Sequence, residues 1–128
     1  QSGLKGVSGI SGDMRQIQQA ITEGNSRAQL AFDVYIHRLR SHIGAMLASL
    51  GGIDAIIFTG GVGENSAPVR FAALEAFKFL GVKINPEQNN ASPADTDIAA
   101  DDSAVRVVVV HTQEDWAIAN ECWHIAKN

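Results

Sequence analysis

A short apolar run that leads directly into three glycines limits the fold of this chain more than any other stretch. Residues 53–59 read Ile-Asp-Ala-Ile-Ile-Phe-Thr, and residues 60–65 read Gly-Gly-Val-Gly-Glu-Asn. A run of this length that is rich in β-branched residues is typical of a buried strand. Glycines after the strand let the backbone approach a ligand closely, because a Cβ there would clash with the ligand or forbid a positive φ. The pattern therefore predicts a buried strand that ends in a ligand-binding glycine loop.

This glycine loop matches neither of the two best-known phosphate-binding loops. The Walker spacing with its final Lys-Ser/Thr is absent, and so is the dinucleotide pattern Gly-x-Gly-x-x-Gly. A helix that begins near Ala67 would direct free N–H groups and the positive end of its dipole towards a ligand at this place. The alternative is a tight turn between the strand and that helix, without a ligand.

Helical and strand patterns alternate along the rest of the chain. Apolar residues recur at helical spacing in four segments, which are residues 13–22, 26–50, 69–80 and 114–125. Short runs typical of strands occupy residues 82–84 and 105–110. The glycine-rich residues 3–12 are predicted to be a loop or a short strand, and the polar residues 85–102 an exposed, variable loop.

This order predicts an α/β architecture, with a sheet flanked by helices and parallel pairing between residues 53–59 and 105–110. Two strong strands are few for an independent sheet. The chain begins at Gln1, with neither an initiator Met nor the layout of a signal peptide. We therefore expect a fragment of a longer chain whose upstream part supplies the rest of the sheet.

Two further motifs lie where helices are expected to begin. The first is Ser11-Gly12-Asp13-Met14-Arg15, in which Asp13 is placed to cap a helix. If this motif binds a ligand, the Asp13 carboxylate would bind a ribose hydroxyl and Arg15 would bind a phosphate or a base. Glu114 and Asp115 follow the second strong strand, where α/β folds bind ligands, and either carboxylate could hold Mg²⁺. The alternatives are a simple cap for Asp13 and dipole compensation for the acidic pair.

Composition excludes several classes of partner and site. The 128 residues are 45% apolar, enough for one sizeable core, and 10 Lys+Arg against 14 Asp+Glu give a net charge of −4. With no basic cluster, we expect neither a nucleic-acid nor an anionic-membrane partner, and no apolar run approaches the roughly 20 residues that span a bilayer. The single Cys122 excludes an internal disulfide and favours a reducing, cytoplasmic location.

The remaining chemistry-bearing side chains are predicted to be structural. Cys122 is expected to be a small core residue, and Trp116 and Trp123, seven apart on one helical face, to lie in the core or an interface. The histidines do not form a zinc spacing with Cys122 and are expected at the surface or in the core; they are His37, His42, His111 and His124.

Three blocks together carry a resemblance to a known family. They are Gly6-Val7-Ser8-Gly9-Ile10-Ser11-Gly12-Asp13-Met14-Arg15, Phe58-Thr59-Gly60-Gly61-Val62-Gly63-Glu64-Asn65, and Thr112-Gln113-Glu114-Asp115. With them the chain resembles the C-terminal part of the acetokinase family, which comprises acetate, propionate and butyrate kinases. The match extends over nearly the whole chain and is weakest in residues 85–102. The Phe-Thr-Gly-Gly block is its most specific part.

The resemblance implies an actin-like ATPase (ribonuclease H-like) fold, here partial, with residues 1–128 as the C-terminal nucleotide-binding domain and the N-terminal domain absent. It implies reversible transfer of the γ-phosphoryl group of ATP to acetate, giving acetyl phosphate and ADP, with Mg²⁺ as the metal. The nucleotide-binding residues would be Asp13, Met14, Arg15, Gly61, Val62, Gly63, Glu64 and Asn65. The metal ligand would be Glu114, with Asp115 as the alternative.

The family's phosphate loop, acetate-binding arginines and catalytic Asp and His match nothing in this chain, so no catalytic residue is expected within it. We therefore expect half of a nucleotide pocket and an inactive fragment. Because the resemblance implies a homodimer, a non-catalytic dimerisation module is the alternative function. A propionate or butyrate kinase is the alternative within the family.

Overall fold

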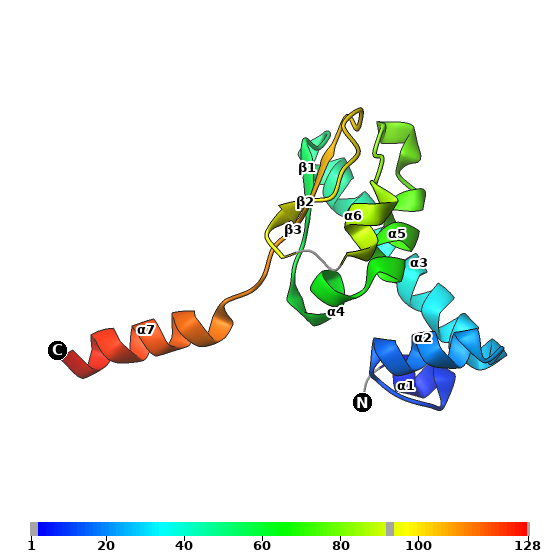
Figure 1. Ribbon diagram of the computed structural model, residues 1–128, viewed down its shortest axis with the longest axis horizontal. Helices are drawn as coiled ribbons and strands as arrows, with labels where there is room; N and C mark the ends of the chain where they lie inside the picture. Colours follow the sequence, from blue (N-terminus) through cyan, green and yellow to red (C-terminus); the bar gives the residue numbers. More distant parts are fainter. Residues whose placement is uncertain (1–2, 92–93, 128) are drawn as a thin grey trace.

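The structure is a computed structural model that describes residues 3–91 and 94–127 (Figure 1). Its helices and strands follow the predicted alternation of helix and strand. In chain order they are α1 (Gly3–Ser8), α2 (Met14–Thr22), α3 (Ser26–Leu50), β1 (Ala55–Phe58), α4 (Gly60–Asn65), α5 (Ala67–Glu75), the 3₁₀ turn η1 (Lys78–Leu80), α6 (Pro86–Asn90), β2 (Thr96–Asp97), β3 (Arg106–Val109) and α7 (Glu114–Lys127).

The three strands form one sheet in the order β1-β3-β2. β1 and β3 are parallel, with Ile56 opposite Val107, and β2 runs antiparallel to β3. The predicted parallel pairing of the two strong strands is thus confirmed. Because both parallel strands end at the same edge of the sheet, the segments that follow them, α4 and the chain leading to α7, begin side by side.

Two buried clusters stabilise the chain, and the long helix α3 packs on both. One cluster joins the sheet to α5 and includes Val107, Val109, Ala73 and Ile43 of α3. The other joins α2 to the first half of α3 and includes Ile17 and Ala28. Helix α3 begins at the cap Asn25 and ends at Gly51, which adopts the left-handed conformation (φ 74°) usual for a helix stop.

Two segments predicted to be irregular are helical. Residues 3–12 contain helix α1, which α3 holds in place: Arg27 Nη2 donates to the carbonyl of Val7 at 3.1 Å. The predicted glycine loop at residues 60–65 is the short helix α4. In both cases tertiary contacts outweigh the low helix propensity of glycine.

The segment at residues 85–102 is also more ordered than predicted. It contains α6 and β2, and Asn89, Ile98 and Ala99 are buried in it, so an exposed loop was the wrong prediction. The strand predicted at residues 82–84 is reduced to one antiparallel bridge, between Ile84 and Ala99. Polar composition hid the buried residues of this segment, because its few apolar side chains are the ones that reach the core.

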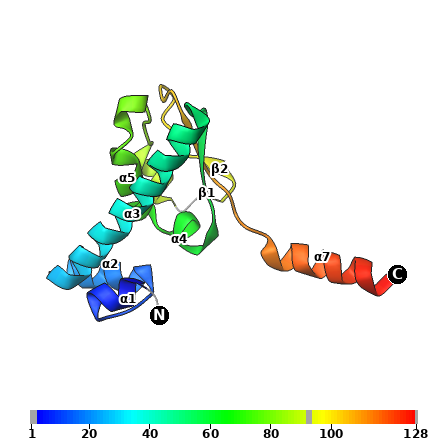
Figure 2. The ribbon, with the colours of Figure 1, turned by 180° about the vertical axis from the view of Figure 1, so that it is seen from behind.

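Helix α7 extends away from the rest of the chain in both views (Figures 1 and 2). Cys122 is therefore exposed, and its predicted core position was wrong. Trp116 and Trp123 are 67% and 60% exposed, which excludes the core of this chain and leaves the interface alternative. Within the described residues, no helix is both long enough and apolar enough to cross a membrane.

Candidate functional site

A cavity of about 660 Å³ lies where the start of α2 faces α4 and the start of α5. It brings together the first two sequence motifs, which are about 50 residues apart in the chain. Its lining residues are Gly12, Asp13, Met14, Arg15, Gln18, Gly61, Val62, Asn65, Ser66 and Pro68. Of the eight predicted nucleotide-binding residues, six therefore share one cavity, and Gly63 and Glu64 are not in its lining.

Asp13 caps helix α2, as the sequence predicts. Its Oδ1 accepts a hydrogen bond from the backbone N–H of Arg15 at 2.9 Å, and Arg15 Nη2 lies 2.8 Å from its Oδ2. Hydrogen bonding to Arg15 lowers the pKa of Asp13 below its ordinary value, so the carboxylate is ionised at neutral pH. The two side chains form one polar unit at the rim of the cavity. Between them, Met14 is buried in the cluster under α2 and fixes the start of this helix.

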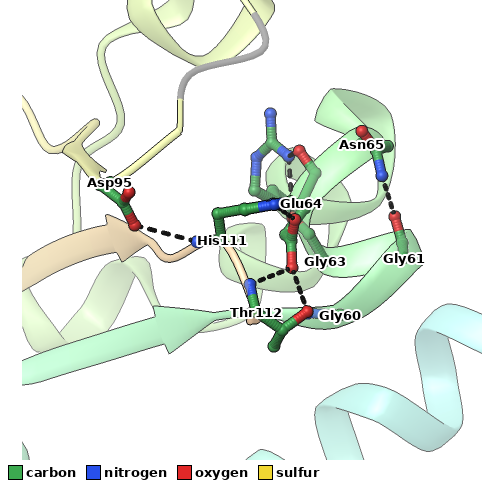
Figure 3. A network of polar contacts seen from close by, with 9 residues as sticks. Gly60, Gly61, Gly63, Glu64, Asn65, Asp95, His111 and Thr112 are labelled. Carbon is green, nitrogen blue, oxygen red and sulfur yellow. Dashed lines mark hydrogen bonds and ion pairs between the residues drawn. The ribbon is translucent and has the colours of Figure 1, made fainter. Parts of the chain in front are cut away.

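At Gly61, helix α4 exposes its backbone to the cavity, without a side chain in between. A Cβ added at Gly61 would meet nothing within 4 Å, so this glycine faces open space. Asn65 Nδ2 donates to the carbonyl of Gly61 at 2.8 Å, which closes the short helix on itself (Figure 3). At Gly63 an added Cβ would lie 3.5 Å from the backbone of Phe58, so that residue packs on the end of β1 instead. A flat ligand can therefore approach α4 at Gly61.

Glu64 does not line the cavity, and its carboxylate contacts the segment that follows β3 (Figure 3). Its Oε1 accepts from the backbone N–H of Gly60 at 3.0 Å and from the N–H and the hydroxyl of Thr112, both at 2.9 Å. Its Oε2 lies 2.7 Å from His111 Nδ1. The hydrogen bonds from Thr112 and His111 lower the pKa of Glu64 to about 2.

Arg70 is fully buried beneath α4, which the sequence analysis did not foresee. Its Nη1 donates to the carbonyls of Gly63 and Glu64, and its Nε and Nη2 donate to Oδ1 and the carbonyl of Asn89, all at 2.8 Å. Arg70 thus satisfies carbonyls at the end of α4 and ties this helix to α6. The available signal was an arginine that directly follows Val69 in a helix composed mainly of apolar residues.

The third motif lies apart from the cavity. Glu114 and Asp115 begin α7 and line a separate hollow of about 350 Å³ with residues 111–113 and Trp116. No cluster of three or more metal-ligating side chains occurs among the described residues. A Mg²⁺ ion held by one or two carboxylates plus phosphates and water needs no such cluster, so the pair Glu114 and Asp115 fits the chemistry of that ion.

The architecture is a mixed α/β unit whose glycine-bearing helix follows a parallel strand and faces a cavity lined by both polar and apolar residues. A sequence model described as the acetokinase family matches residues 1–120, and the chain therefore belongs to this family. It is 65% identical over 127 residues to the acetate kinase of Nostoc punctiforme, covering 99% of this chain and 31% of that protein. To the acetate kinase of Gloeobacter violaceus it is 69% identical over 122 residues, covering 95% and 30%.

Solved structures of the same family share the fold. The acetate kinase of Porphyromonas gingivalis matches with a TM-score of 0.85 and 38% identity, over 96% of this chain and 31% of that one. A propionate kinase of Francisella tularensis matches with a TM-score of 0.81 and 33% identity, over 92% and 30%. The fold is thus a mixed α/β part of the actin-like ATPase fold, and the chain spans under a third of the length of the relatives it matches.

Proposed function

We propose that residues 1–128 are the C-terminal, nucleotide-binding part of a two-domain acetate kinase. The complete protein transfers the γ-phosphoryl group of ATP reversibly to acetate, giving acetyl phosphate and ADP. The observation that carries this proposal is the single cavity that unites the Asp13–Arg15 helix start with Gly61 and Asn65 of α4. Family membership and the acetate kinases at 65–69% identity support the choice of reaction.

The cavity offers complementary contacts for a nucleoside. The Asp13 carboxylate accepts hydrogen bonds from ribose hydroxyls, and the Arg15 guanidinium is available for a phosphate or for stacking on a base. Gly61 lets the flat base or the sugar approach the backbone of α4, because no side chain stands in the way. In a chain of net charge −4, such local donors offset the repulsion of a negative nucleotide.

Glu114, with Asp115 as the alternative, would hold Mg²⁺ in company with the nucleotide phosphates. Bound there, Mg²⁺ would neutralise charge on the transferring phosphoryl group. The acceptor carboxylate and the groups that act on the γ-phosphoryl belong to the other part of the proposed two-domain protein. Phosphoryl transfer depends on charges positioned from both sides of the site, so we expect residues 1–128 alone to be inactive.

Two alternatives are favoured by particular observations. The match to a propionate kinase at 33% identity keeps a longer acyl substrate open. Exposed apolar side chains on α3, among them Leu30 and Met46, fit a role in pairing two copies of the protein. Both alternatives are compatible with nucleotide binding in the cavity. A pairing role without nucleotide binding would be excluded by loss of ADP affinity in a Gly61→Leu variant of the full-length protein.

The experiment is trapping of the acyl phosphate as its hydroxamate. The full-length protein that carries this chain, supplied with Mg-ATP, is assayed with acetate, propionate and butyrate in parallel, beside residues 1–128 alone. We expect the full-length protein to form acetyl hydroxamate with a higher kcat/KM than the longer acids give, and the fragment to form none. Product from the fragment alone, or none from the full-length protein with any of the three acids, would contradict the proposal.

A further inference from the structure

The carboxylate of Glu64 joins two segments that lie nearly 50 residues apart in the sequence. Gly60, at the start of α4, follows β1, whereas His111 and Thr112 follow β3. Glu64 receives hydrogen bonds from Gly60 and Thr112 and pairs with the ring of His111 (Figure 3). The Glu64 side chain is only 12% exposed, whereas the His111 side chain that it contacts is 60% exposed.

The contacts begin where the backbone pairing of the two parallel strands ends. The N–H of Val110 still donates to the carbonyl of Phe58 at 2.9 Å, in continuation of the β1-β3 pairing. The next two backbone N–H groups donate to carboxylates instead: His111 to Asp95 Oδ1 at 3.0 Å and Thr112 to Glu64 Oε1 at 2.9 Å. Side chains therefore set the path of the chain as it leaves the sheet towards α7.

Glu64 is itself held firmly. Arg70, fully buried, donates to the carbonyls of Gly63 and Glu64 from beneath α4. A buried guanidinium with four hydrogen bonds has little freedom, so the backbone that carries the Glu64 side chain is fixed on its inner side. The carboxylate is then a rigid anchor for the segment that it contacts.

Glu114 begins α7 two residues after Thr112. We propose that Glu64 is a positioning residue, which fixes the direction of the chain at Thr112 and so places the carboxylate at the start of α7 relative to the nucleotide-facing helix α4. This inference rests on the proposed function, since it assigns a task to the link between the nucleotide cavity and the proposed metal ligand. It also gives a role to Glu64, which does not line the cavity that Gly61 and Asn65 line.

The first test measures the link without metal or nucleotide. In the full-length protein, amide hydrogen exchange at Thr112 and Gly60 is compared between the wild type, Glu64→Ala, and the control Glu75→Ala. Glu75 also pairs with a neighbouring side chain, Lys78 at 2.8 Å, but on the surface of α5. We expect Glu64→Ala to speed exchange at both amides about 10-fold or more, since a hydrogen bond to the charged Glu64 carboxylate protects each of them. Unchanged exchange at Thr112 would overturn the proposal.

The second test separates positioning from general damage. ADP affinity is measured in the presence of a chelator, and Mn²⁺ affinity of the ADP complex is measured by electron paramagnetic resonance. We expect Glu64→Ala to weaken Mn²⁺ binding about 10-fold, the usual effect of losing an outer-shell partner of a metal ligand, with ADP affinity within about 2-fold of wild type. A fall of both affinities by the same factor would overturn the proposal.

Two milder variants keep the test decisive if Glu64→Ala fails to fold. Glu64→Gln retains one acceptor oxygen, and Thr112→Val removes the hydroxyl bond but keeps the backbone one. We expect each variant to weaken Mn²⁺ binding less than Glu64→Ala would. Each should nevertheless weaken Mn²⁺ binding more than it weakens ADP binding. If neither variant changes Mn²⁺ affinity while the wild type binds ADP, the positioning role is overturned and the proposed function stands. If the wild type binds no ADP, the proposed function itself is overturned.

Discussion

The Glu64 carboxylate combines little exposure with hydrogen bonds that favour its ionised form. Because the pKa of Glu64 is about 2 in the folded protein, below the ordinary value of 4.5, the charged form is stabilised on folding. A group whose pKa is lower in the folded protein than in the unfolded chain stabilises the fold fully at a pH above its unfolded-state pKa. This stabilisation is lost as the pH falls towards its folded-state pKa. The contribution of Glu64 should therefore disappear between about pH 4.5 and about pH 2.

This window gives a prediction for acid unfolding. Glu64→Gln is expected to lower the free energy of unfolding by a constant amount from about pH 7 to about pH 5. Below about pH 5 this loss should become smaller as the pH falls. The measurement is a series of urea unfolding curves for the wild type and the variant. Glu75→Gln serves as the control, because its surface pair should contribute little at any pH. If the free energies of unfolding of the wild type and Glu64→Gln differ by the same amount at about pH 6 and at about pH 3, ionisation of Glu64 does not contribute to stability.

Among the elements, α4 depends most on its neighbours. It has six residues, three of them glycines, and no side-chain hydrogen bond at its N-cap Thr59. Such a helix is not stable alone, since short glycine-rich helices neither nucleate nor propagate well. The buried Arg70 supplies stabilisation that the helix lacks, through its hydrogen bonds to the carbonyls of Gly63 and Glu64.

Replacement of Arg70 tests that dependence. Arg70→Met fills most of the volume but leaves the carbonyls of Gly63, Glu64 and Asn89 without their donor, and we expect it to lower the free energy of unfolding by about 2–4 kcal/mol. Arg38→Met, on the exposed face of α3, should change it by less than about 0.5 kcal/mol. Chemical denaturation measures both. Equal stability of the two variants would mean that Arg70 does not hold α4.

The elements that could be predicted from the sequence are those with a clear local sequence pattern. β1 and β3 lie in short runs rich in β-branched residues, α2 and α3 combine an apolar period with a capping residue, and all four elements agree with the prediction. α1 and α4 were missed because their helical state depends on Arg27 and Arg70, contacts with distant parts of the chain. The cavity followed from two motifs at element ends, whereas the link from Glu64 to Thr112 could not be predicted, because no local pattern records which segment a carboxylate faces.

At the scale of the whole molecule, helix α7 extends away from the body that the other elements form (Figure 2). The body brings Asp13 and Gly61 to one cavity, while Glu114 begins the extended helix α7. In the proposed two-domain enzyme the body binds the nucleotide, and α7 presents its carboxylate to the phosphates. Correct orientation of α7 would then matter for the metal and little for the nucleoside.

The most direct measurement is a calorimetric titration of the full-length protein with ADP, comparing the wild type, Gly61→Leu and Gly44→Leu. A Cβ at either glycine meets nothing within 4 Å, and leucine favours helix, so neither variant should unfold the protein; only Gly61 lines the cavity. We predict that Gly61→Leu weakens ADP binding about 10-fold or more, equivalent to about 1.4 kcal/mol, and that Gly44→Leu leaves it unchanged. Equal ADP affinity in the wild type and Gly61→Leu would contradict the assignment of this cavity to the nucleotide.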